Sequence, residues 1–178
     1  MKMCSFLLND LNFEKDALQP CCNVRGLNSL PRFTFTGGRV DMAAYTQHIK
    51  KVIVALQETT ELCRGCPELW DIALDEDNTS SDLADIINVI VFKTISINKH
   101  RHLCNCKCVY CDLWKHRTDS YDILPPLKSL KAQFALDDHC FFSWGGGEPT
   151  ILKEFPETSD WIARHGYWQY IHTNAIRY

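Results

Sequence analysis

The sequence predicts an α/β fold in which strands and helices alternate through the second half of the chain. Residues 86–97 form a nearly continuous apolar run rich in β-branched side chains, as in a strand buried on both faces. Two shorter apolar segments, 139–144 and 167–172, follow it, and a helical pattern precedes each of them. This order of elements is typical of a parallel sheet with right-handed crossovers.

The first half contains one clear helix. Asp41 is a suitable N-cap for a helix from Met42 to Glu61, and apolar residues recur along it at helical spacing. The side chains expected on its buried face are Tyr45, Ile49, Val52, Ile53 and Leu56. Turn-forming residues at 23–26 and 37–38 predict irregular structure for the rest of this half.

Two helices are expected between the three strands of the second half. The first begins at Pro125-Pro126, with proline in its first turn, and its apolar positions are Leu127, Leu130, Phe134 and Ala135. The second covers 156–165 and ends before Gly166.

An acidic, polar stretch divides the chain. Residues 75–85 have the composition of a linker, so we expect a small, irregular, cysteine-rich unit with one helix at 1–74 and a second unit at 86–178. A small loop-rich unit needs a cross-link, and a metal held by its cysteines would provide one.

Composition excludes several classes of protein. The chain has 178 residues, 46% of them hydrophobic and 23% charged, as in a folded domain. A net charge of −3 provides no basic surface for nucleic acid or anionic lipid. No apolar run is long enough to span a membrane, and the N-terminus lacks a signal peptide. We therefore expect a cytoplasmic protein with no nucleic-acid or membrane partner.

Ten cysteines are many for a chain of this length. In a reducing compartment, clustered thiols more often bind metal or carry out redox chemistry than form disulfides. A zinc site built from the pairs Cys63/Cys66 and Cys108/Cys111 is disfavoured, because the gap between the pairs far exceeds the roughly 15–20 residues usual for four-cysteine zinc sites.

Chemically distinctive segments follow each of the three predicted strands. They are the cysteine-rich stretch 104–111, the segment Gly145-Gly146-Gly147-Glu148-Pro149, and Thr173-Asn174. The carboxyl ends of parallel strands meet at one edge of a sheet, so we expect one composite site there. Cys104, Cys108 and Cys111 have C-x3-C-x2-C spacing, which can present three thiolates to a cubane iron–sulfur cluster and leave one iron open.

The stretch CNCKCVYC, followed one strand later by GGGEP, resembles the core of the radical S-adenosylmethionine (radical SAM) enzymes. Thr173-Asn174 is similar to the Thr-Asn-Gly that often follows the third strand in that family, with Ala175 in place of the glycine. The resemblance implies the first half of a partial (β/α)6 TIM-like barrel with parallel strands. At roughly 30 residues per βα unit, 86–178 has room for about three strands, so we expect a fragment of a longer enzyme.

The resemblance also implies roles for individual residues. Cys104, Cys108 and Cys111 would hold a [4Fe-4S] cluster whose fourth iron is chelated by S-adenosylmethionine. Gly146, Gly147 and Glu148 would line its methionine moiety, and Tyr110 would lie near its adenine. Reductive cleavage would yield a 5′-deoxyadenosyl radical that abstracts hydrogen from an unknown substrate, a peptide or a small metabolite. An electron donor such as flavodoxin or ferredoxin is the implied partner. Cys106 and Cys140 are interpreted as small buried side chains.

Cysteines of the first half resemble those of SPASM-type auxiliary-cluster domains, although such domains usually follow the barrel. The implied ligands of a second iron–sulfur cluster are Cys4, Cys21, Cys63 and Cys66, with Cys22 as the alternative to Cys21. Structural zinc or free thiols are the alternatives for this group. The alternative function for the whole chain is a non-catalytic, cysteine-rich metal-binding interaction module.

Overall fold

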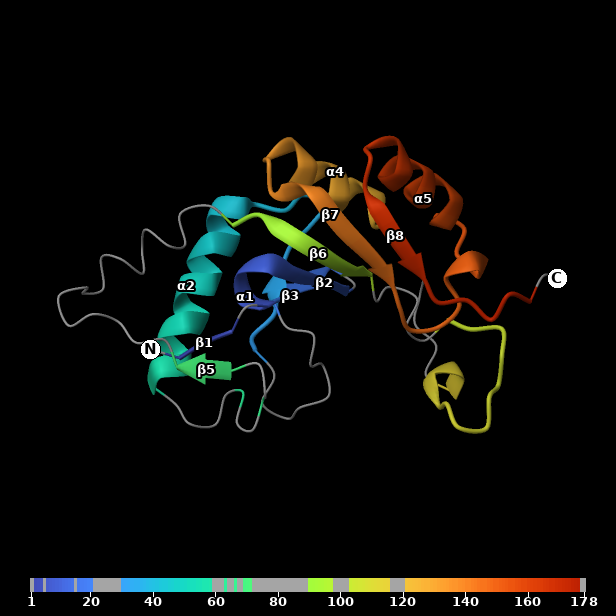
Figure 1. The fold of residues 1–178 in the computed structure, drawn as a ribbon, viewed down its shortest axis with the longest axis horizontal. Coiled ribbons are helices and arrows are strands. Elements are labelled where there is room, and N and C mark those ends of the chain that lie inside the picture. The colour runs from blue at the N-terminus through green and yellow to red at the C-terminus, as the bar shows by residue number, and fades with distance from the viewer. Residues whose placement is uncertain are drawn as a thin grey trace.

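A computed structural model describes residues 2–4, 6–14, 16–20, 30–58, 63, 66, 69–71, 90–97, 103–115 and 121–176. Across these ranges the main feature is a six-stranded mixed sheet in the order β4-β3-β2-β6-β7-β8 (Figure 1). A two-stranded sheet pairs β1 (Lys2–Cys4) with β5 (Leu69–Asp71). No helix in the described ranges is both long enough and apolar enough to cross a membrane.

The second half has the predicted βαβαβ order. The elements are β6 (Phe92–Ile97), α4 (Leu124–Ala132), β7 (Leu136–Trp144), α5 (Phe155–Arg164) and β8 (Trp168–Ile171). Both strand pairs are parallel, as expected. The strand predicted at 86–97 begins only at Phe92, and residues 86–89 lie outside the described ranges.

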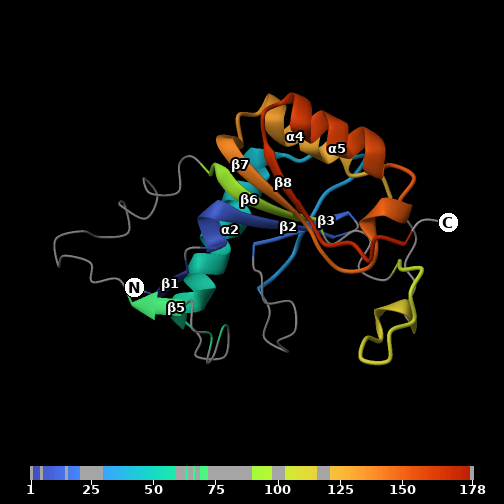
Figure 2. The ribbon, with the colours of Figure 1, turned by 45° about the vertical axis from the view of Figure 1, so that its right-hand side comes forward.

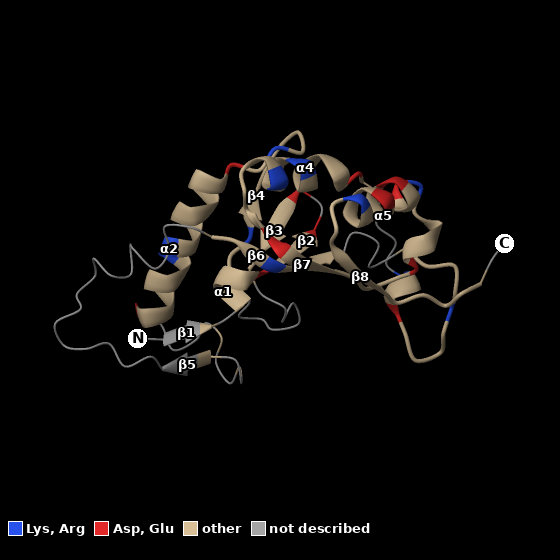
Figure 3. Ribbon diagram, turned by 45° about the horizontal axis from the view of Figure 1, so that its top comes forward, with Lys and Arg blue, Asp and Glu red and all other residues tan. Residues whose placement is uncertain are grey.

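The two faces of the sheet differ in chemistry. Helices α4 and α5 lie on one face of the sheet (Figures 1 and 2). Ile95, Phe142 and Trp144 are fully or almost fully buried and share one face by their register. Trp144 packs edge-on against Phe155 of α5 at a ring-centroid distance of 4.9 Å. Thr94 and Ser143 point to the opposite face and are partly exposed. The helices turn charged residues outward, with lysines on α4 and both signs of charge on α5 (Figure 3).

Helix α4 is shorter than the sequence pattern predicts. It begins at Leu124 with proline in its first turn, and Leu127 and Leu130 are buried as expected. Phe134 lies beyond the helix at φ 56° with 86% of its surface exposed, so its expected place on the apolar helix face is wrong. The chain must leave the helix there to start β7, and this turn directs Phe134 into solvent.

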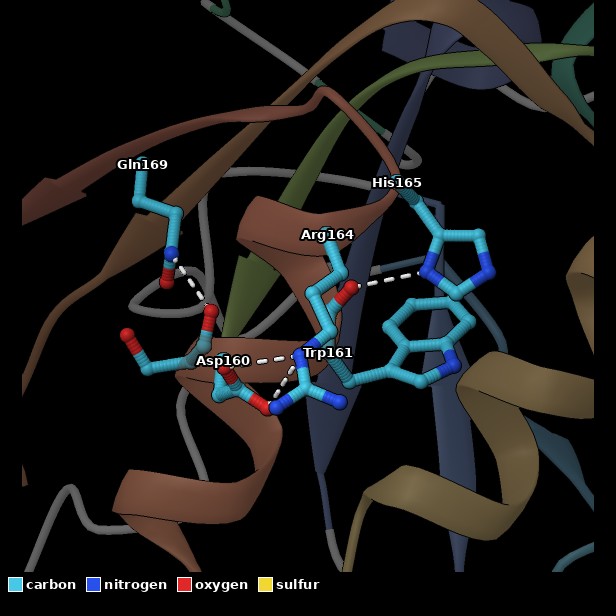
Figure 4. Close-up of polar contacts among 6 residues, drawn as sticks. Asp160, Trp161, Arg164, His165 and Gln169 are labelled. Atoms are coloured by element: carbon cyan, nitrogen blue, oxygen red, sulfur yellow. Dashed lines mark hydrogen bonds and ion pairs between the residues drawn. The ribbon is translucent and has the colours of Figure 1, made fainter.

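Contacts along one side of α5 fix β8 against the sheet. Gln169 of β8 donates from Nε2 to the backbone oxygen of Ser159 at 2.8 Å and accepts from Trp144 Nε1 at 3.1 Å. Figure 4 shows the bond from Gln169 to α5, together with the Asp160–Arg164 ion pair on the outer surface of the helix. The helix ends at Arg164, just before Gly166, as predicted.

The described part of the first half is more regular than expected. Helix α2 covers Met42–Glu58, Asp41 Oδ1 accepts from Ala44 N at 3.0 Å, and all five predicted core residues are buried. The expectation of irregular structure elsewhere is wrong, because this half also forms α1 (Phe6–Asn9), β2 (Asp10–Glu14), β3 (Ala17–Gln19) and β4 (Phe33–Thr34).

Strand β2 pairs in parallel with β6, so the two halves of the chain share one sheet. A hydrogen bond from Gln133 Nε2, just after α4, to Val40 O at 2.6 Å also links the two halves of the chain. In the described ranges the strands form an open sheet with β4 and β8 at its edges. The acidic segment 75–85 lies outside those ranges, so the proposed division there stays a prediction, as does the barrel.

Candidate functional site

One cavity of about 490 Å³ lies at the carboxyl ends of β6, β7 and β8. Its walls come from the cysteine loop (residues 104–111), the glycine loop (residues 145–148) and the β8 end (residues 170–174). These are the segments that the sequence predicts to converge. Cys104, Cys108 and Cys111 all line the cavity together with Gly146, Gly147 and Glu148.

Backbone hydrogen bonds shape the cysteine loop. Cys111 N donates to Cys108 O at 3.1 Å, which closes a turn around the last two cysteines of the motif. Trp114 Nε1 donates to the same carbonyl at 3.4 Å. At the start of the loop, Leu103 O accepts from Glu148 N at 2.8 Å, so the cysteine loop and the glycine loop are joined through the main chain.

Cys106 is not the buried side chain that the sequence pattern indicates. It is partly exposed and lines the cavity beside the three motif cysteines. Its backbone N–H donates to Cys104 Sγ at 3.4 Å, and its own Sγ accepts from Asn174 Nδ2 at 3.1 Å. Desolvation, followed by the electrostatic effect of the neighbouring Cys104, Cys108 and Glu148, raises the pKa of the Cys106 thiol.

Tyr110 projects from the tip of the loop with 89% of its surface exposed, so it is not a core side chain. It nevertheless lines the cavity. A hydrogen bond to Cys108 and the electrostatic effect of Cys108 and Cys111 raise the pKa of Tyr110. An exposed ring beside a cavity is available to stack on a planar ligand group.

The glycine loop turns sharply at the end of β7. Gly146 has φ 108°, a backbone conformation that side-chain-bearing residues rarely adopt. Gly145 N donates to Ile97 O at 3.4 Å, which ties the loop to the end of β6. The sequence Gly-Gly-Gly therefore provides both the turn and a close approach of backbone to the cavity.

Glu148 is the buried centre of the site, with only 1% of its surface exposed. Its Oε1 accepts from Thr150 N at 3.1 Å, Thr150 Oγ1 at 2.7 Å and Thr173 Oγ1 at 2.9 Å, and its Oε2 accepts from Asn174 N at 2.6 Å. Burial alone would raise the pKa of this carboxyl, but the hydrogen bonds outweigh burial and lower it. Glu148 is thus held as a carboxylate that joins the ends of β7 and β8.

The β8 end matters more than its sequence suggests. Beyond its bond to Glu148, Asn174 donates from Nδ2 to Asn105 Oδ1 at 2.7 Å, so it links the glycine loop to the cysteine loop. Ala175, which stands where the resembled motif has glycine, adopts φ 56°. The position therefore requires the left-handed conformation that glycine adopts most easily, even though alanine occupies it here.

In the described ranges no three Cys, His, Asp or Glu side chains converge closely enough to hold one metal ion. A cubane cluster spreads its thiolate ligands over different iron atoms, so its cysteines stand further apart than the ligands of one ion. Three motif thiols around an open cavity of about 490 Å³ are compatible with that arrangement.

Backbone contacts connect the segments that contain three of the four proposed auxiliary ligands, but these three side chains do not form a site for one metal ion. Cys4 in β1 pairs with Leu69 in β5, and Leu69 N donates to Cys66 O at 3.3 Å. Cys66 N in turn donates to Cys63 O at 2.9 Å, so Cys63 and Cys66 form a turn immediately before β5. Cys21 and its alternative Cys22 lie outside the described residues.

Cys140 behaves as the sequence predicts. It is fully buried in β7, where burial raises the pKa of its thiol to about 12.

Comparison of the chain with protein-family models, with curated proteins and with solved structures found no match.

Proposed function

We propose that the cavity at the ends of β6, β7 and β8 binds a [4Fe-4S] cluster and S-adenosylmethionine, as in a radical SAM enzyme. The observation that supports this most is the convergence of the three motif cysteines, the glycine loop and Glu148 on one cavity, although they come from different crossovers of the sheet. Ligand sites in parallel α/β sheets lie at this edge.

Cys104, Cys108 and Cys111 would hold three irons of the cluster and leave the fourth without a protein ligand. An open metal position is what distinguishes a catalytic metal site from a structural one. When bound, the cluster supplies the electron that splits S-adenosylmethionine into methionine and a 5′-deoxyadenosyl radical. The protein's contribution is to bind, orient and shield these groups.

The glycine loop would bind the methionine part of S-adenosylmethionine. The backbone at Gly146 and Gly147 carries no side chain between it and the cavity, so its carbonyl and amide groups can reach a ligand. The Oε1 atom of Glu148 already accepts three hydrogen bonds, whereas Oε2 accepts one. Oε2 therefore retains acceptor capacity for the ligand's ammonium group.

Tyr110 would stack on the adenine or close over it. Its exposed ring lies at the rim of the cavity, and stacking on a planar ligand group would remove the apolar face of the ring from water. A reduced electron donor of the flavodoxin or ferredoxin class completes the proposal, and the substrate, a peptide or a small metabolite, is unknown.

A second, fully ligated cluster in the same chain would use Cys63 and Cys66, which form a turn, and Cys4, which pairs with Leu69 in the strand that follows this turn. A cluster with four protein ligands has no open iron, so electron transfer or stabilisation of the fold is its natural role. Residue 21 or 22 would supply the fourth thiolate.

Anaerobic reconstitution with iron and sulfide tests the proposal. The expected protein is brown, contains about four irons per occupied site, and changes its visible spectrum when S-adenosylmethionine is added. Cys108→Ala should lose that response, while Cys140→Ala, which alters a buried cysteine outside the cavity, should keep it. A colourless protein with stoichiometric zinc would instead support the non-catalytic metal-binding module.

A further inference from the structure

The cysteine loop contains one thiol more than the proposed function requires. Cys106 lies between Cys104 and Cys108 in the sequence, is partly exposed, and lines the same cavity. Iron–sulfur clusters commonly take four cysteine thiolates. The Cys106 thiolate could therefore coordinate the iron atom to which S-adenosylmethionine would bind.

The side chain of Asn174 holds the Cys106 sulfur on the β8 side of the cavity. Its Nδ2 donates to Cys106 Sγ at 3.1 Å and to Asn105 Oδ1 at 2.7 Å. The amide cannot easily turn away, because Asn174 Oδ1 accepts from Ile176 N at 2.9 Å and Asn174 N donates to Glu148 Oε2 at 2.6 Å. The amide that donates to the Cys106 sulfur is therefore held in place by two hydrogen bonds, one from the backbone N–H of Asn174 and one from the backbone N–H of Ile176.

We propose that Asn174 is a positioning residue that keeps Cys106 from becoming the fourth ligand of the cluster. This inference rests on the proposed function, because it explains how a loop with four thiols leaves one iron open. Without the amide, an iron–sulfur bond to Cys106 would form, its thiol proton would pass to solvent, and no electrons would be exchanged. S-adenosylmethionine would then have to displace a thiolate in order to bind.

The test compares the wild-type protein with Asn174→Ala, the double variant Asn174→Ala/Cys106→Ala, and the control Gln57→Ala. The control removes a side-chain amide on α2 that donates to Ile53 O and does not line the cavity. After reconstitution, iron content and the electron paramagnetic resonance (EPR) spectrum of the reduced cluster are recorded with and without S-adenosylmethionine. Wild type and Gln57→Ala should shift on addition, Asn174→Ala should keep its iron but lose the shift, and the double variant should recover it.

The metal-free protein provides a second readout that needs no cluster. Alkylation of each cysteine, followed by mass spectrometry, should show that Asn174→Ala changes the reactivity of Cys106 relative to Cys104 several-fold, because the amide that donates to the Cys106 sulfur is gone. An unchanged ratio would overturn the inference.

The outcomes separate the two proposals. A wild-type cluster that ignores S-adenosylmethionine refutes the proposed function. A wild-type cluster that responds, alongside an Asn174→Ala cluster that responds equally, refutes only the role of Asn174. Failure of the double variant to recover the shift also refutes it, since Cys106 would not then be the competing ligand.

Discussion

Replacing Glu148 by glutamine should destabilise the protein even without any bound group. The carboxylate is buried and accepts four hydrogen bonds from Thr150, Thr173 and Asn174. Glutamine keeps one carbonyl oxygen for the three donors at Oε1. Its amide nitrogen, however, would face the backbone N–H of Asn174, which now sits 2.6 Å from Oε2, and two donors would meet.

The size of the loss follows from the individual bonds. One buried donor left without an acceptor costs about 1–3 kcal/mol. The bonds that remain at Oε1 lose their charge assistance, which is worth about 1 kcal/mol for each bond. The full sum would be about 4–6 kcal/mol, but water in the adjacent cavity can reach part of the network, so we expect a smaller total of about 2–4 kcal/mol.

Urea unfolding of the metal-free protein measures this difference, with Glu157→Gln on the exposed surface of α5 as the matched control. The folded-state pKa of Glu148 is lowered, so its contribution is present above the unfolded-state pKa and is lost as pH falls through the folded-state pKa. The gap between wild type and Glu148→Gln should therefore be full at pH 7 and shrink below about pH 4. A gap under about 0.5 kcal/mol at pH 7, no larger than that of a surface substitution, would refute the structural role given to Glu148.

Four further predictions test other parts of the structure. Cys108→Ala should abolish cleavage of S-adenosylmethionine, whereas Cys63→Ala should remove only the auxiliary iron and leave some cleavage. Deoxyadenosine assays and iron counting measure both effects, and loss of cleavage in Cys63→Ala with the first cluster intact would contradict the prediction. Gly38→Ala should be less stable than Gly37→Ala by about 1–3 kcal/mol. Both glycines have positive φ, but a Cβ at Gly38 would lie 2.6 Å from Pro125 Cβ, whereas a Cβ at Gly37 would have no atom within 4 Å. Equal melting temperatures of the two variants would argue against this contact. Cys140 should resist alkylation in the native protein while the cysteine-loop thiols react, since it is fully buried with its pKa raised to about 12; rapid labelling at neutral pH would contradict that burial. Ala175→Gly should stabilise the protein modestly, by about 0.5 kcal/mol, by relieving the left-handed backbone at φ 56°; a loss of stability in thermal unfolding would show that no such strain exists.

Periodic and local signals in the sequence were sufficient for the helices and for the order of the second half. The spacing of Tyr45, Ile49 and Leu56 predicts which face of α2 is buried, because helical periodicity is a local property. Asp41 and the prolines of α4 and α5 mark helix starts through equally local chemistry. The ends of these helices were less predictable, as Phe134 shows.

Pairings between distant segments could not be read from the sequence. β2 has only five residues and its neighbour β6 begins at Phe92, so nothing local indicates that the two pair in parallel. The sequence does predict that the cysteine and glycine loops converge, because both follow strands of one parallel sheet. It does not predict that Asn174 links the two loops.

The sequence predicts that Asn174 lies at the composite site, but it does not predict the contact between Asn174 and Cys106. Cys106 is expected to be a small buried side chain, because the motif that the sequence resembles usually has an apolar residue at this position. The side-chain hydrogen bond between Asn174 and Cys106 joins two residues far apart in the sequence and leaves no periodic signal. The sequence signal for this contact is the additional cysteine within the C-x3-C-x2-C spacing.

The most direct test of the central claim asks whether S-adenosylmethionine binds the open iron. The measurement is electron–nuclear double resonance on the reduced, reconstituted protein with S-adenosylmethionine labelled with ¹⁵N at its amino group. The account predicts a coupling between the labelled nitrogen and the cluster spin that disappears in Cys108→Ala. A fully reconstituted wild-type cluster that shows no such coupling at saturating S-adenosylmethionine would contradict it.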